Sequence, residues 1–248
     1  MPATDRLARE QGIPFMRQTK VFTLEQACSS IKDGATVLVG GFGQPGTPNQ
    51  LLRQLAEQGP RALILVKNDA SEPGLGVSLL LEAGQVERLI ASHIGLNPLA
   101  VKMMHAGELV IEVYPQGILA EKIRAGGAGL GGILTDIGLH LDDAGRQRVA
   151  VNGVDYLIEP ALRGDVALIH AEKADEMGNL IFTQTAYNFN PAMATAADLV
   201  IVEVNQIVPA GDLEPDRIHL PGAFVDRLVR VEDPGAEYGV LAHHALQA

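Results

Sequence analysis

A β-branched apolar run that stops at two glycines constrains this chain more than any other segment. Residues 35–39 read Ala-Thr-Val-Leu-Val, and a glycine-rich loop, Gly-Gly-Phe-Gly-Gln-Pro-Gly, follows at residues 40–46. Such a run is typical of a buried strand, and glycines after it let the backbone approach a ligand closely. We expect the four glycine N–H groups of this glycine loop to be free to face an anionic or thioester group, with the dipole of a helix that begins near Asn49 behind them. The alternative is a loop whose glycines serve packing alone.

Composition favours an aliphatic core and excludes some partners. Hydrophobic residues make up 47% of the 248 residues, aromatic residues only 4%, and there is no Trp, as expected where buried parallel strands supply the core. The formal net charge is −11 with 19 Lys and Arg, which argues against nucleic-acid binding. Phosphates on a ligand would therefore depend on local dipoles and a few cations.

Cysteine, histidine and hydropathy patterns limit the chemistry and the location. Cys28 is the only cysteine, so internal disulfides and a cysteine metal cage are excluded, and a buried structural role on an early helix is favoured. The seven histidines show no metal-ligand spacing. The N-terminus lacks the apolar region of a secretory signal, and no apolar run reaches the roughly 18 residues of a membrane helix. We expect a soluble, cytoplasmic protein with no bound metal and no membrane partner.

Short apolar runs alternate with helical patterns along the chain. This alternation predicts an α/β fold with an open, mixed, mostly parallel sheet and helices on both faces. Asn152-Gly153 between two alternating runs, Arg148–Val151 and residues 154–158, predicts a hairpin, so a purely parallel sheet is not expected. The other predicted strands are residues 35–39, 62–66, 86–91, 109–114, 166–171 and 199–204.

No linker-like stretch or internal repeat divides the chain. Residues 1–20 are polar and unpatterned, which predicts a flexible N-terminal extension. We expect a single domain over residues 21–232 and a C-terminal tail over residues 233–248.

Several segments resemble the alpha (A) subunit of the family I coenzyme A transferases. The glycine loop, with Asp33-Gly34 before it and Pro48 after it, resembles the signature of that subunit, and the likeness is greatest to bacterial acetate/acetoacetyl-CoA transferases. It extends from roughly Val21 to Val231. The further segments that carry it, in family order, are residues 91–98, 115–117, 121–132 and 188–191.

The resemblance implies an enzyme that moves CoA between a short-chain acyl-CoA, such as acetyl-, acetoacetyl- or butyryl-CoA, and a free carboxylic acid. CoA would be substrate and product, with no permanently bound cofactor. In the family, a glutamate in a Ser-Glu-Asn-Gly segment of the beta subunit forms the glutamyl-CoA intermediate. This chain has only Ser71-Glu72-Pro73-Gly74, so we expect the nucleophile in a beta subunit, within an α2β2 assembly.

The same resemblance assigns roles to particular residues. It implies an oxyanion-hole role for Gln116, which follows a predicted strand at the end where open α/β sheets place ligands. From the residues alone, a turn residue that ties down a loop is an equal alternative. CoA binding is implied for the residues of the glycine loop: Gly40, Gly41, Phe42, Gly43, Gln44, Pro45 and Gly46.

Other polar residues have structural explanations that compete with functional ones. Arg124 before the glycines of residues 125–129 marks either a helix end or an approach to the acyl pocket or the partner. Ser92 and His93 are adjacent on an extended chain and point opposite ways, so a pocket-lining or interface role is favoured over catalysis. Structural ion pairs are the expected role of three acidic residues on or near strands: Glu112, Glu159 and Glu203.

One departure from the family pattern leaves the reaction partly open. Where the family commonly has Thr-Pro-Thr-Gly, this chain has Thr135-Asp136-Ile137-Gly138, so the acyl specificity is not fixed. Two alternatives remain: a hydrolase of CoA thioesters or CoA-linked ring compounds, and a non-catalytic sensor of a CoA metabolite.

Overall fold

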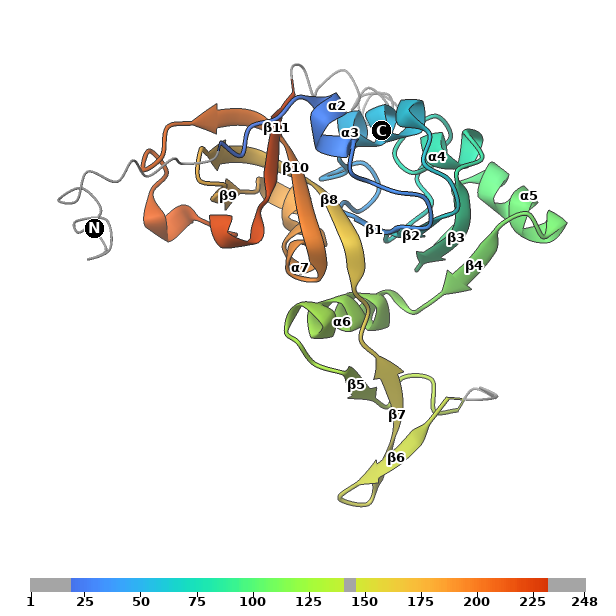
Figure 1. Cartoon of the computed structure of the whole chain (residues 1–248). Helices are drawn as coiled ribbons and strands as arrows, with labels where there is room; N and C mark the ends of the chain where they lie inside the picture. Colours follow the sequence, from blue (N-terminus) through green and yellow to red (C-terminus); the bar gives the residue numbers. More distant parts are fainter. Residues whose placement is uncertain (1–18, 141–145, 232–248) are drawn as a thin grey trace, which may run out of the picture.

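The computed structural model describes residues 19–140 and 146–231, and it has the predicted mixed α/β architecture (Figure 1). Its main sheet has the strand order β11-β10-β8-β1-β2-β3-β4, in which all neighbours are parallel. One further strand, β9, pairs antiparallel with β8. The strands are β1 (Thr36–Val39), β2 (Leu63–Val66), β3 (Val86–Ala91), β4 (Val110–Val113), β8 (Gly164–Asp175), β9 (Leu180–Ile181), β10 (Ala197–Val208) and β11 (Arg227–Arg230).

Helices cover both faces of this sheet, as predicted. On one face lie α2 (Leu24–Cys28), α3 (Asn49–Gln58), α4 (Ser78–Glu82) and α5 (Pro98–Ala106), and on the other lie α6 (Gln116–Gly127) and α7 (Asn190–Thr195) (Figure 1). Short 3-10 turns complete the described chain: η1 (Gln184–Tyr187), η2 (Pro215–Arg217) and η3 (Gly222–Phe224).

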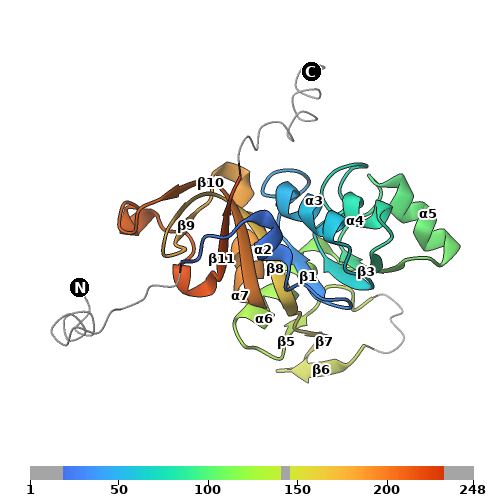
Figure 2. The same cartoon turned by 45° about the horizontal axis from the view of Figure 1, so that its top comes forward.

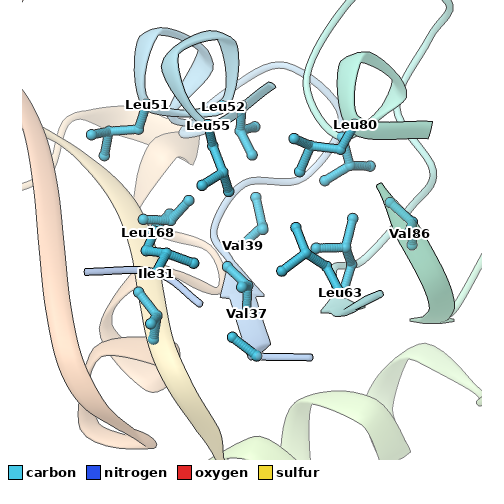
Figure 3. Close-up of a cluster of buried hydrophobic side chains, with 14 of the residues drawn as sticks. Ile31, Val37, Val39, Leu51, Leu52, Leu55, Leu63, Leu80, Val86 and Leu168 are labelled. Carbon is cyan, nitrogen blue, oxygen red and sulfur yellow. The ribbon is translucent and has the colours of Figure 1, made fainter. Parts of the chain in front are cut away.

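Strand β1 separates two hydrophobic clusters because successive side chains on a strand point to opposite faces. Val37 and Val39 pack under α3, whereas Leu38 belongs to the cluster under α6 and α7. Figure 3 shows three leucines of α3, at positions 51, 52 and 55, above these valines. All six of these side chains are fully buried, so β1 is an entirely internal strand.

The predicted hairpin is present, but it forms a separate sheet. Strands β6 (Arg148–Val151) and β7 (Val154–Pro160) are antiparallel and join β5 (Gly132–Thr135) in the order β5-β7-β6. Asn152 and Gly153 have φ values of 52° and 79°, as a two-residue hairpin turn requires. This small sheet lies beyond α6, away from the main sheet (Figures 1 and 2). The mixed character of the main sheet therefore comes from β9.

Strand boundaries differ most where polar residues prolong a buried run. β8 and β10 each have 12 residues, although their apolar runs predict six. Both continue side by side in register from Glu203↔His170 to Val208↔Asp175. Of the expected N-terminal extension, residues 1–18 lie outside the described residues, as does the expected tail at 233–248. Lys20 is described, and its ammonium donates to the carbonyls of Gly222 and Val225.

The strand order reverses direction at β1. From β1 the chain proceeds through β2 and β3 to β4 at one edge, and it later returns to place β8 on the other side of β1. Ligands of open α/β sheets bind at such a reversal, outside the carboxyl ends of the strands. The glycine loop leaves β1 at this point.

We predict that Cys28 is inert in the folded protein. Its side chain is buried against the carbonyl of Leu51, and burial raises the pKa of the thiol to about 12. Since the thiolate is the reactive form, iodoacetamide at pH 8 should leave the native chain unmodified and alkylate it fully in denaturant, as measured by intact mass. Modification of native protein at the rate of an exposed thiol would contradict this assignment.

Candidate functional site

The carboxyl ends of four neighbouring strands gather the predicted site residues at one edge of the main sheet. β1 leads into the glycine loop, β2 into residues 67–69, β3 into Ser92, and β4 into Gln116. Parallel strands end at the same edge, so these segments lie side by side. Hydrogen bonds between the segments, given below, confirm that they are in contact.

Two glycines of the loop are required by a neighbouring side chain. A Cβ atom on Gly40 would lie 1.8 Å from Oδ1 of Asn190, and one on Gly46 would lie 2.5 Å from its Nδ2. Asn190 is fully buried, donates to the carbonyl of Gly46 at 3.1 Å and accepts from the backbone N–H of His170 at 3.2 Å. Packing therefore accounts for part of the glycine content.

The expectation that all four glycine N–H groups are free is wrong for two of them. Gly40 donates to the carbonyl of Leu168 at 2.9 Å, which continues the ladder between β1 and β8. Gly43 donates to Oδ2 of Asp69 at 2.8 Å. Within the described residues, the N–H groups of Gly41 and Gly46 donate to no protein acceptor. Two amides of the loop thus remain available to a ligand.

Helix α3 begins at Asn49 as predicted, but a buried carboxylate already occupies its first amides. Oε2 of Glu203 accepts from the backbone N–H groups of Gln50 (2.9 Å) and Leu51 (3.0 Å). Its Oε1 lies 3.1 Å from Nδ1 of His170. A carboxylate at this position stabilises the positive end of the helix dipole. The dipole therefore serves Glu203, and the expectation that it faces a ligand is wrong.

Gln116 is connected to the glycine loop by a continuous path of hydrogen bonds. Its Nε2 donates to Oδ1 of Asn68 at 2.8 Å, and the hydroxyl of Ser92 lies 2.9 Å from the same oxygen. Nδ2 of Asn68 donates to Oδ2 of Asp69 at 3.1 Å, the oxygen that accepts from Gly43. The Gln116 amide has two N–H groups, so one remains for a ligand. Ser92 is engaged by Asn68, which agrees with a supporting position.

The sequence reasoning missed residues 67–69, which join these parts. Lys67 is fully buried and its Nζ lies 3.2 Å from Oδ1 of Asp69. Burial lowers the pKa of Lys67, and the Asp69 carboxylate opposes this effect. Burial also acts to raise the pKa of Asp69, but Lys67 and hydrogen bonds from Gly43, Asn68 and Ser71 hold that pKa below its usual value. Three polar residues directly after a buried strand were the available signal.

The remaining loop residues differ in exposure. Phe42 is 49% exposed, an unusual state for an aromatic side chain in a chain with few of them. Gln44 is buried, and its Oε1 accepts from Nδ2 of Asn49 at 3.2 Å. The carbonyl of Pro45 accepts from Nδ2 of Asn188 at 2.9 Å. Inner residues of the loop are thus held by asparagines, while Phe42 faces outward.

Two cavities border this region of the molecule. One of about 310 Å³ adjoins the loop at Pro45 and His170. The other, of about 710 Å³, lies between β4, α6 and β7 and is lined by no residue of the loop. Among residues 19–140 and 146–231, no group of three or more His, Cys, Asp or Glu side chains could hold a metal ion. None of the helices in these ranges is long and apolar enough to cross a membrane.

Structural contacts account for the competing candidates. Arg124 pairs with Glu121 at 2.7 Å on the surface of α6. The glycines after it allow close packing, since a Cβ on Gly126 would lie 2.2 Å from the carbonyl oxygen of Leu162. The ion pairs expected for three glutamates are confirmed, the last when its imidazole is protonated: Arg88–Glu112, Lys122–Glu159 and His170–Glu203.

Comparisons with known proteins agree with this architecture. The model of the coenzyme A transferase family matches residues 21–231. The alpha subunit of the acetate CoA-transferase of Escherichia coli K12 is 44% identical over 213 residues, which cover 86% of this chain and 97% of that protein. One of the subunits of the succinyl-CoA:3-ketoacid coenzyme A transferase of Helicobacter pylori J99 is 44% identical over 215 residues, 86% of this chain and 93% of that protein.

A solved structure extends the comparison. An acyl-CoA transferase of Escherichia coli O157:H7, in a thioester complex with CoA, superposes with a TM-score of 0.79 at 25% identity, covering 89% of this chain and 48% of that one. The present chain thus spans about half the length of that relative. The fold and the site define an α/β protein with its ligand site at the carboxyl edge of a parallel sheet. The chain belongs to the coenzyme A transferase family, which confirms the resemblance found in the sequence.

We predict that two glycines of the loop respond very differently to alanine. Gly40→Ala should cost about 3 kcal/mol in the free energy of unfolding, because the new methyl displaces Asn190 and breaks its hydrogen bonds. At Gly43 no heavy atom lies within 4 Å of the Cβ position, so Gly43→Ala should cost only about 1 kcal/mol for its φ of 59°. Urea unfolding followed by circular dichroism measures both, and equal losses would contradict the packing role of Gly40.

Proposed function

We propose that this chain is the alpha subunit of a heteromeric CoA transferase that moves CoA between a short-chain acyl-CoA and a free carboxylic acid. Acetyl-CoA, acetoacetyl-CoA and butyryl-CoA are the proposed donors, and CoA is substrate and product. Family membership and the near-complete coverage of a relative named as an alpha subunit support the proposal. The observation that carries it is the path of hydrogen bonds that holds Gln116 beside the glycine loop at the reversal of strand order.

Hydrogen-bond donors are what this edge offers to the reaction. Attack on a thioester carbonyl places negative charge on its oxygen, and fixed N–H groups in a site without water stabilise that charge. We assign this task to the second N–H of Gln116. We assign contact with CoA to residues 40–46, where the N–H groups of Gly41 and Gly46 have no protein acceptor within the described residues.

A beta subunit completes the proposed enzyme. The sequence has no Ser-Glu-Asn-Gly segment, and the solved acyl-CoA transferase is about twice as long as this chain. We infer that the partner supplies the glutamate, whose carboxylate attacks the acyl-CoA to give an anhydride and CoA thiolate. The thiolate then attacks the glutamyl carbonyl, which releases the first acid and leaves glutamyl-CoA for the second acid. An α2β2 assembly in the cytoplasm is part of this proposal.

The first functional prediction concerns dependence on the partner. The purified chain alone should show no CoA transfer, and mixing it with the beta subunit should give ping-pong kinetics with acetyl-CoA and acetoacetate, or butyryl-CoA and acetate. Steady-state assays measure both states. Robust turnover by the single chain would refute the division of roles. CoA release without an acceptor acid would identify a hydrolase, and tight CoA binding in calorimetry without any turnover would identify a sensor.

The second functional prediction concerns Gln116. In the reconstituted enzyme, Gln116→Ala should lower kcat by about 10²–10³-fold, the usual effect of removing one oxyanion donor. Gln58→Ala is the control, because Gln58 lies at the other end of α3 and donates only to the carbonyl of Glu25; its kcat should equal that of the unmodified enzyme. A change of less than threefold for Gln116→Ala would leave this residue with a structural role only.

A further inference from the structure

Gly43, in the middle of the glycine loop, has both of its backbone polar groups held by one ion pair. Its N–H donates to Oδ2 of Asp69 at 2.8 Å, and its carbonyl accepts from the ammonium of Lys67 at 3.2 Å. The same ammonium lies 3.2 and 3.3 Å from the two carboxylate oxygens of Asp69. Lys67 and Asp69 follow strand β2, 24 and 26 residues away along the chain. The orientation of the Gly43 peptide groups is thus fixed from a neighbouring strand.

Stability alone does not explain this pair. The side chains of Lys67 and Asp69 are 0% and 9% exposed. Removing two charges from water is costly, and replacing a buried ion pair by apolar side chains of similar volume is often neutral or stabilising. What an apolar pair cannot supply is a donor and an acceptor for a backbone that bends away from regular structure. The hydrogen bonds to Gly43 are therefore the distinctive product of the pair.

Side-chain packing gives Gly43 no comparable support. No heavy atom lies within 4 Å of the position a Cβ would take, its φ is 59°, and the neighbouring Phe42 is half exposed. Thr47 adds one bond, from its hydroxyl to the same carbonyl at 2.6 Å. The direction of the loop between Gly41 and Gly46 thus depends on polar contacts.

The pair also connects the loop to Gln116. Asn68, between the two charged residues, donates to Asp69 and accepts from Gln116. Any shift of Asp69 therefore moves two acceptors, one for the loop and one for the residue that orients Gln116.

We propose that Lys67 and Asp69 are positioning residues of the site: they fix the Gly43 peptide groups and set the glycine loop relative to Gln116. What the loop binds rests on the proposed function above. The pair is neutral as a whole, so it orients the loop without adding a net charge beside an anionic ligand. Neither residue needs to touch a substrate.

Hydrogen exchange tests this positioning without reference to activity. In Lys67→Met the Gly43 carbonyl loses a donor and Asp69 loses its counter-ion. Amide exchange in a peptide spanning residues 38–48, measured by mass spectrometry on the folded chain, should accelerate about tenfold. Unchanged exchange in this variant would overturn the proposal, whether or not the chain proves to be a CoA transferase.

A double variant separates positioning from stability in the enzyme reconstituted with its beta subunit. Lys67→Met leaves a buried carboxylate unpaired and should lower the melting temperature. Lys67→Met with Asp69→Asn removes that unpaired charge, so the melting temperature should recover. The Gly43 carbonyl still lacks its ammonium donor, so KM for acyl-CoA should stay about tenfold raised, with a smaller effect on kcat. Recovery of KM together with stability would show a merely structural pair and overturn the proposal.

Lys122→Met is the matched control. Lys122 and Glu159 form a similarly buried pair, with 6% and 4% exposed side chains and a 3.1 Å separation, between α6 and β7. This variant should lose stability while exchange of residues 38–48 and KM stay unchanged. Changes in either as large as those of Lys67→Met would mean that loss of any buried pair loosens the loop, which would also overturn the proposal. If the unmodified complex shows no CoA transfer, the proposed function fails, and the exchange measurement still decides the positioning role.

Discussion

Strand β1 is paired on both edges and buried on both faces, and the remainder of the architecture depends on this double confinement. Its neighbours β2 and β8 hold it through parallel ladders, while Val37 and Val39 face one helical layer and Leu38 faces the other. A strand confined in this way must be aliphatic and short, and the chain that leaves it must turn at the edge of the sheet. Because β8 lies where a simple succession of strands would not place it, that turn opens at the reversal point.

Sequence reasoning succeeded where one segment carries its own signal. Buried β-branched runs predicted β1 to β4 within one residue or so at each end, and Asn152-Gly153 predicted the hairpin. It failed where the deciding contact joins distant residues. Nothing near Asn49 reveals that Glu203, 152 residues from Leu51, occupies the first amides of α3. Lys67 is the other case: its burial against Gly43 follows from the order of strands, which alternating patterns do not specify.

Charge placement reconciles the acidity of the chain with an anionic ligand. The formal net charge is −11, yet the buried carboxylates at the functional edge have partners. Asp69 is paired with Lys67, and Glu203 accepts two helix amides and contacts His170. Partnered carboxylates present little field to a ligand, whereas the acidic surface remains in water, where salt screens it.

The donors that remain describe half of a reaction site. Glu203 satisfies the amides of α3, Asp69 that of Gly43, and the β8 ladder that of Gly40. What the edge still offers is the N–H groups of Gly41 and Gly46 and one N–H of Gln116. These groups stabilise negative charge and hold an acyl chain in place, but none of them is a nucleophile. A glycine loop held this firmly, beside an oriented amide, suits a subunit that fixes a thioester while another subunit supplies the reacting carboxylate.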